Sequence, residues 1–283
     1  MGLIEGISGV LSRIVSPKKQ PTQVAASRHD NISKARRSLD LAERKLGPDH
    51  PDVAREIMEL VSALNWAGKH AEAESLALRA LAILEKAYGP VHQEVASVLD
   101  TIALSYQGQF DYAKAESFCK RWLTVQEQIG DLDRLAYCLL RFGELYRNRG
   151  DFATAESYYQ RSVVVREEQG DPGELADTLR GFADLYERQE AYAKAEELYK
   201  RSLAVLESGC DLEAVAEGLV YLAYHYETRE EFASAEPLYK RALQIWEETG
   251  DKEELVSVLD DLADCYESQK RYADAERTYN RAL

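Results

Sequence analysis

The chain has 283 residues, of which 45% are hydrophobic and 30% charged, so it can bury a sizeable core and still present a water-soluble surface. Its formal net charge of −15 argues against nucleic acid as the main partner, because phosphate binding requires a basic surface. No run of about 18 apolar residues occurs, so no transmembrane helix is predicted, and four scattered cysteines without a CxxC pair favour a reducing cytoplasm over a disulfide framework or a zinc site.

The first predicted element is an amphipathic N-terminal helix. Its apolar side chains fall on one stripe, Pro17 ends it, and two lysines follow at once. Such a helix beside a basic cluster is typical of an interfacial membrane anchor. The predicted membrane-contact residues are Leu3, Ile4, Ile7, Val10, Leu11, Ile14, Lys18 and Lys19.

Residues 1–26 are therefore expected to form this helix and a basic, proline-containing linker. Residues 1–37 carry seven Lys or Arg against two carboxylates, whereas the rest of the chain is acidic. Contact with an anionic membrane through residues 1–19 would place a cytoplasmic protein peripherally at the membrane. A cap on the following helices, a protein-binding helix and a flexible tail are the alternatives.

The rest of the chain repeats itself. Six Ala-Glu pairs recur at a step of 42 residues and then 40 residues four times, beginning at Ala73, Ala115, Ala155, Ala195, Ala235 and Ala275. A tyrosine column keeps the same step at Tyr106, Tyr146, Tyr186, Tyr226 and Tyr266. A period between about 20 and 50 residues is the signature of stacked repeats.

Each repeat predicts two helices. In the third, Leu139, Phe142 and Tyr146 lie three or four residues apart, as on one face of a helix, and Gly150 separates them from a second such stripe. Small alanines let the two helices of a pair approach closely, and neighbouring pairs must stack to bury their stripes. The prediction for residues 27–283 is an all-α array: an orphan helix at 27–47, then six helix pairs, the last one truncated.

The order of small, Tyr, Gly, aromatic, Ala and aromatic positions in these pairs resembles the tetratricopeptide repeat. The repeat length and the loops KLGPDHPDVA (45–54) and AYGPVHQEVA (87–96) are similar to those of kinesin light chains. The resemblance covers residues 30–283 and implies a right-handed superhelical solenoid of tetratricopeptide helix pairs. Kinesin light chains often carry paired asparagines in the first helix of a repeat. Here other pairs stand in that place, such as Asp260-Asp261, so that family's peptide contacts are not carried over.

The sequence offers no constellation for catalysis. It contains no HExxH, GxSxG or glycine-rich phosphate loop, and its five histidines do not converge. His50 and His92 share a loop position and are expected to have a loop-capping role rather than to bind a metal. His225 is expected on the inner side of its helix, where ligand contact is the less favoured of two interpretations. Asp260-Asp261 is interpreted as a solvated face. We expect no enzyme, no metal site and no cofactor.

The resemblance also places the binding surface. In a tetratricopeptide superhelix the first helix of each pair lines the concave groove. The predicted protein-binding groove residues are Tyr137, Arg141, Glu144, Asn148, Arg180, Asp184, Arg188, Tyr221 and Tyr224. Arginine mixed with aromatic residues is a composition suited to anchoring a protein partner.

These observations predict a non-catalytic adaptor. The resemblance to kinesin light chains, and in particular to the bacterial type that accompanies bacterial tubulins, implies a tubulin-like filament as a partner and the membrane as another. The alternative is a cytoplasmic regulatory sensor that binds a peptide or small ligand in its groove. The truncated last repeat is expected to leave an apolar flank open near Leu262, Tyr266 and Tyr279 and to self-associate through it.

Overall fold

The computed structural model describes the backbone of residues 21–209 and 211–282, with side chains from residue 30 onward. The predicted membrane-contact residues, from Leu3 to Lys19, lie outside the described residues. Among those described, no helix combines the length and the apolarity needed to cross a bilayer.

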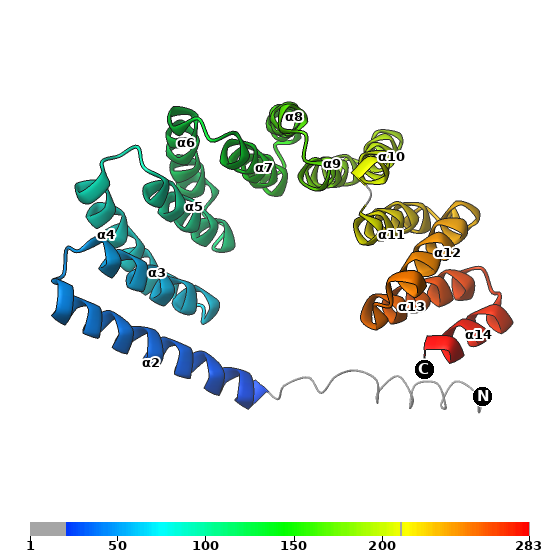
Figure 1. The fold of residues 1–283 in the computed structure, drawn as a ribbon, viewed down its shortest axis with the longest axis horizontal. Coiled ribbons are helices and arrows are strands. Elements are labelled where there is room, and N and C mark those ends of the chain that lie inside the picture. The colour runs from blue at the N-terminus through cyan, green and yellow to red at the C-terminus, as the bar shows by residue number, and fades with distance from the viewer. Residues whose placement is uncertain (1–20, 210, 283) are drawn as a thin grey trace. The chain divides into compact units, whose positions relative to one another are not determined.

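The described residues form thirteen helices and no strand (Figure 1). The helices are α2 (Pro21–Leu46), α3 (Pro51–Trp66), α4 (His70–Tyr88), α5 (Gln93–Gly108), α6 (Tyr112–Ile129), α7 (Leu132–Arg149), α8 (Phe152–Gln169), α9 (Pro172–Glu187), α10 (Tyr192–Gly209), α11 (Leu212–Thr228), α12 (Phe232–Thr249), α13 (Lys252–Ser268) and α14 (Tyr272–Ala282). The predicted all-α solenoid of helix pairs is confirmed.

The chain divides into two compact units. Unit 1 ends at Ile129, and within it each helix from α2 to α6 packs on the next. The orphan helix α2 begins at Pro21, six residues before its predicted start, so part of the expected linker is helical. Gly47, with a φ of 86°, follows the end of this helix in a conformation that glycine adopts without strain.

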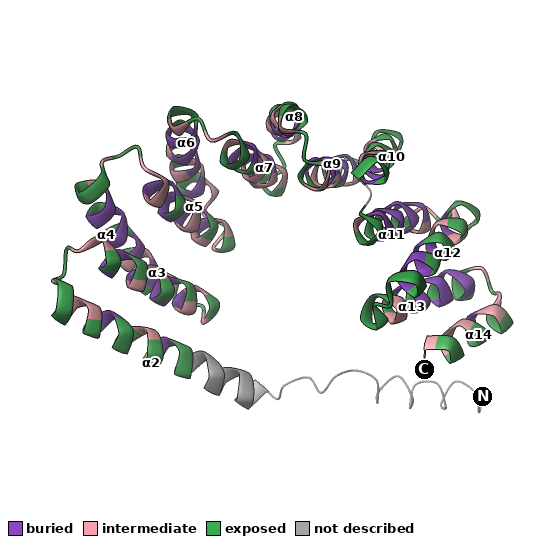
Figure 2. Cartoon of the chain, in the orientation of Figure 1, coloured by how far each residue is buried: buried purple, intermediate pink, exposed green. Residues whose placement is uncertain are grey.

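Unit 2 begins at Gly130 and holds four helix pairs, from α7/α8 to α13/α14. Within it, α7, α9, α11 and α13 form one layer and α8, α10, α12 and α14 the other (Figure 1). Buried residues follow the sides on which helices meet (Figure 2). In both units the six alanines of the Ala-Glu column are at most 2% exposed, which is why larger residues do not recur there.

Four glutamates of the Ala-Glu pairs accept hydrogen bonds from the tyrosine column. The hydroxyl of Tyr186 donates to Glu156 at 2.8 Å, that of Tyr226 to Glu196 at 2.8 Å, and that of Tyr266 to Glu236 at 3.1 Å. In unit 1, Tyr106 donates to Glu74 in the same way. Within each unit, these four tyrosines are therefore bonded to the Ala-Glu column of the repeat before their own, which gives the two sequence columns one structural cause.

Helix caps differ between the units. In unit 1 the Nδ1 atoms of His50 and His92 accept from backbone N–H groups two residues on, each at 3.2 Å. The predicted capping role of both histidines is confirmed. In unit 2 the N-cap of the first helix of every pair is an aspartate whose side chain accepts from backbone N–H groups. These aspartates are Asp131, Asp171, Asp211 and Asp251.

The expectation of an open apolar flank in the last repeat is wrong for two of its three residues. Leu262 is 4% and Tyr266 5% exposed, because the short helix α14 packs against α13. The hydroxyl of Tyr279 donates to Asp264. No exposed cluster of these three side chains is present to carry self-association.

Candidate protein-binding surface

The predicted groove residues all lie on α7, α9 and α11 of unit 2 or, for Arg188, at the C-cap of α9. We call the surface formed by α7, α9, α11 and α13 the odd-helix face. Asn148, Asp184 and Arg188 are exposed on it, and Glu144 is partly exposed. The sequence therefore assigned these residues to one surface of one unit.

Three tyrosines are the large apolar groups of this surface. Tyr137 is 42% exposed, Tyr221 47% and Tyr224 62%. The guanidinium of Arg180 lies over the ring of Tyr221, 4.2 Å from its centroid. This cation–π contact restrains both side chains, so Tyr221 is presented to solvent in a defined position.

The arginines of the face are less available than the sequence predicted. Arg141 pairs with Glu144, and Arg180 pairs with Asp177, three residues away on its own helix. Both arginine side chains are only 19% exposed. Asp177 was missed at the sequence level, although its spacing to Arg180 is that of a helical ion pair.

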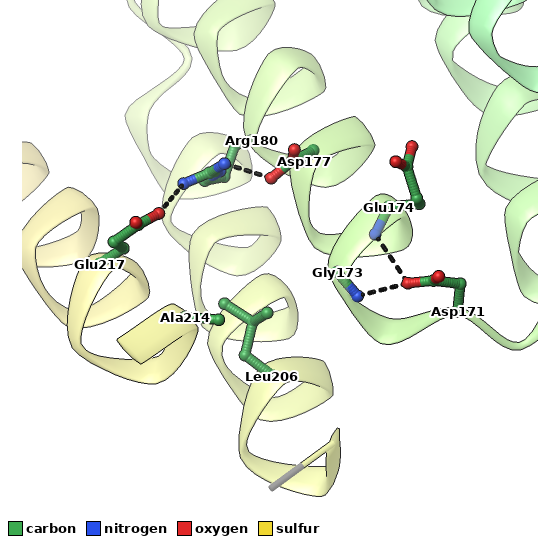
Figure 3. A pocket seen from close by; sticks show the side chains of 8 residues that line it. All are labelled: Asp171, Gly173, Glu174, Asp177, Arg180, Leu206, Ala214 and Glu217. Carbon is green, nitrogen blue, oxygen red and sulfur yellow. Dashed lines mark hydrogen bonds and ion pairs between the residues drawn. The ribbon is translucent and has the colours of Figure 1, made fainter. Parts of the chain in front are cut away.

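Arg180 also borders a depression between α9 and α11, with a volume of about 230 Å³ (Figure 3). The carboxylate of Asp171 caps α9, accepting from the N–H groups of Gly173 at 2.9 Å and Glu174 at 3.2 Å. Across the depression, Glu217 reaches Arg180 at 3.9 Å. Burial raises the pKa of Glu217, an effect that Arg180 opposes. The depression is thus walled by carboxylates around one guanidinium.

The structure excludes the less favoured interpretation of His225 as a ligand contact. Its side chain is 0% exposed, and its Nδ1 contacts Glu187. The ring lies 5.3 Å from that of Tyr199. The residue occupies the buried side of α11, so it belongs to the core of unit 2.

Carboxylates crowd the other end of the odd-helix face, on α11 and α13. Burial, together with the charges of Glu227, Asp264, Asp260 and Glu254, raises the pKa of Asp261 to about 6. Asp261 is only partly exposed, so the interpretation of Asp260-Asp261 as a solvated face is wrong for its second residue. Within the part of the chain that the structure describes, no group of His, Cys, Asp or Glu could hold a metal ion.

Unit 1 has a separate depression of about 450 Å³ between α2 and α3. Polar side chains of both helices line it, and Trp66, 51% exposed, stands at its edge. The depression mixes Lys34 with Glu56 and Glu59 and offers no chemistry beyond polar contact.

Comparison with known proteins agrees with this architecture. The family described as tetratricopeptide repeat matches residues 56–128, 134–208 and 214–283. Comparison with curated proteins gives no match.

Among solved structures, BtubC (BKLC) from P. vanneervenii superposes with a TM-score of 0.57 at 19% identity, over 90% of this chain and 89% of that one. A putative kinesin light chain with nearly identical TPR-like repeats from Podosopora anserina gives a TM-score of 0.58 at 17% identity, over 71% and 99%. A Rap protein complexed with competence and sporulation factor gives 0.54 at 16% identity, over 82% and 63%. Identities this low show a shared fold, and the kinesin light chain type predicted from the sequence is among the folds that match.

Proposed function

This chain belongs to the tetratricopeptide repeat family, and we propose that it is a non-catalytic adaptor whose odd-helix face binds a protein partner. One observation carries the proposal: three exposed tyrosines stand on that face among arginines that are already held in place. Rigid aromatic side chains bury a large area at a low cost in conformational entropy, and they are enriched among the residues that dominate binding energy.

We further propose a tubulin-like filament as the partner, with the N-terminal segment at the membrane. The filament is supported by the sequence resemblance to bacterial kinesin light chains and by the fold shared with BtubC (BKLC). The membrane contact rests on the apolar stripe and basic cluster of residues 1–19.

A second candidate function is a sensor that binds a short peptide on the same face. It is favoured by the fold shared with a Rap protein that is complexed with competence and sporulation factor. The two functions differ in the partner and not in the surface.

Exchange of two tyrosines tests the surface. The double variant Tyr221→Ala, Tyr224→Ala should bind filaments of purified bacterial tubulin at least about tenfold more weakly in co-sedimentation, because it removes two exposed aromatic anchors. Tyr272→Ala is the matched control, since Tyr272 is 65% exposed but lies on α14, outside the face.

Equal binding by the double variant and the wild type would exclude this face. Failure of the wild type to sediment with filaments would exclude the filament, and submicromolar binding of a short peptide by the same protein would then support the sensor.

A further inference from the structure

Four tyrosines occupy one position in the second helices of unit 2: Tyr159, Tyr199, Tyr239 and Tyr279. The last three each donate their hydroxyl to a carboxylate on the first helix of their own pair. The acceptors are Asp184 at 2.8 Å for Tyr199, Glu227 at 2.7 Å for Tyr239, and Asp264 for Tyr279.

Tyr159 is the exception among these four tyrosines. It is 0% exposed, and its hydroxyl has no hydrogen-bond partner among the described residues. A buried hydroxyl without a partner destabilises the fold, so its presence requires an explanation.

The missing acceptor follows from two residues of α7. Glu144 stands where Asp184 and Asp264 stand relative to their tyrosines, but its carboxylate is held by Arg141. Arg147 stands at the position that corresponds to Glu227, and a guanidinium has no acceptor to offer. Both routes by which the other tyrosines are satisfied are therefore closed at Tyr159.

Two more buried donors without a partner among the described residues lie on α7. The Nε atoms of Arg141 and Arg147 are buried and have no acceptor within the described part of the chain. Among the described residues, Arg147 pairs with Asp184 at 3.6 Å, and Asp184 already accepts from Tyr199. Burial raises the pKa of Tyr159, the charges of Glu144 and Asp184 raise it as well, and those of Arg147 and Arg141 lower it.

The ring of Tyr159 is held on both sides. A Cβ atom added at Gly143 of α7 would lie 2.9 Å from the ring, and one added at Gly181 of α9 would lie 3.4 Å from it. The two glycines thus make room for the ring between helices that pack side by side (Figure 1). The confined ring therefore leaves the hydroxyl little freedom to turn to another acceptor.

We propose that these three donors, the hydroxyl of Tyr159 and the Nε–H groups of Arg141 and Arg147, bind the carboxylate of an aspartate or glutamate side chain of the partner protein. A carboxylate is the acceptor that the three equivalent tyrosines use, and its two oxygens can accept from several donors at once. Entry is from the odd-helix face, where the side chains of Arg141 and Arg147 are 19% and 13% exposed and Glu144, the partner of Arg141, is 25% exposed. The site rests on the proposed function, because it supplies part of the chemistry by which that face recognises its partner.

The test uses N-acetylglutamate amide, a minimal glutamate side chain, as the probe with the full-length protein. Its binding is followed through the arginine Nε–H resonances in a ¹H–¹⁵N correlation spectrum. Saturable shifts of the Arg141 and Arg147 resonances are expected in the millimolar range. Tyr159→Phe should weaken the binding about tenfold, because it removes one hydrogen bond to a charged group. N-acetylglutamine amide, which has the same shape without the charge, should shift neither resonance.

Tyr239→Phe is the matched control from the same column. It removes a hydroxyl that is bonded within the fold, so it should lower thermal stability and leave probe binding unchanged. Tyr159→Phe should have the opposite effects, weaker probe binding with stability unchanged or raised.

Three results would overturn the site. One is the absence of saturable shifts in the wild type. Another is equal probe affinity in Tyr159→Phe. The third is a loss of stability in Tyr159→Phe as large as that in Tyr239→Phe, which would mean that the hydroxyl is bonded within the fold. Larger shifts of these resonances with inorganic phosphate than with the glutamate probe would also argue against a carboxylate ligand. Retention of filament or peptide binding alongside any of these results would leave the adaptor function standing and reject this site alone.

Discussion

The two ends of the odd-helix face are built from the same repeat and have opposite polarity. Between α7 and α9, buried donors of Arg141, Arg147 and Tyr159 lack acceptors. Between α11 and α13, carboxylates are in excess, and burial beside like charges raises the pKa of Asp261 to about 6. The repeat therefore determines the position of a side chain on the face, whereas the charge of the residue at that position determines which ligand group it can bind.

This difference gives the face a direction. A partner that offers a carboxylate to α7 and α9 and a cation to α11 and α13 would match both ends, and the reversed partner would match neither. Substitutions at one end of the face, each with a control at the other end, test this difference.

The largest effect on stability is expected from substitution of Gly143 on α7, with Gly218 on α11 as its comparison. Gly143→Ala should lower the free energy of unfolding by about 1–3 kcal/mol, because the new methyl group would lie 2.9 Å from the confined ring of Tyr159. Gly218→Ala should stay within about 1 kcal/mol of the wild type, since its methyl group meets the flexible end of Leu206 and alanine favours the helix. Urea unfolding followed by circular dichroism measures both. Similar losses in the two variants would show that Tyr159 is no more confined than Leu206.

The acidic end should respond to neutralisation. The pKa of Asp261 rises from 3.8 to about 6 on folding, so its favourable contribution is complete below the lower value and is lost as the pH rises through the upper one. Asp261→Asn should therefore raise the free energy of unfolding near neutral pH by about 1–2 kcal/mol and flatten its dependence on pH between those values.

The control for this variant lies at the other end. Asp177→Asn removes the partner of Arg180 and should lower stability instead. Urea unfolding at several pH values measures both variants. If Asp261→Asn lowered stability near neutral pH, the ionised carboxylate would be stabilising and the crowding argument would fail.

The smallest effect is expected in the turns between the helices of a pair. Glu230, between α11 and α12, has a φ of 59°, whereas its counterpart between α7 and α8 is Gly150, with a φ of 85°. Glu230→Gly should raise the free energy of unfolding by less than about 1 kcal/mol, because glycine adopts this conformation without steric cost, and Gly150→Ala should lower it by a similar amount. Thermal unfolding measures the pair, and a loss of stability in Glu230→Gly would contradict the argument.

Much of the fold could be predicted from the sequence because it depends on interactions that are local or that recur at every repeat. The stripe of Leu139, Phe142 and Tyr146 needs only the helical period, and the capping histidines His50 and His92 act on backbone two residues away. The alanines of the Ala-Glu column recur once in each repeat and are all buried, so one rule explains all six of them.

The candidate site was predicted by position but not by chemistry. The helices that carry Arg141, Arg180 and Tyr221 were identified correctly, yet the pairing of the two arginines with Glu144 and Asp177 depends on rotamers that no periodicity encodes. Tyr159 was not singled out from the sequence, because a tyrosine on the buried stripe of a second helix resembles any other core residue.

The sequence by itself thus determined the period, the helix pairs and the layer to which each helix belongs, since these follow from short-range geometry repeated along the chain. Only the tertiary structure decided that His225 is buried against Glu187, that Asp261 is partly withdrawn from water and that Tyr159, of the four equivalent tyrosines, has no acceptor among the described residues. Each of these outcomes depends on contacts between side chains of neighbouring helices that are 12 to 38 residues apart in the sequence. It also depends on how much water these contacts exclude.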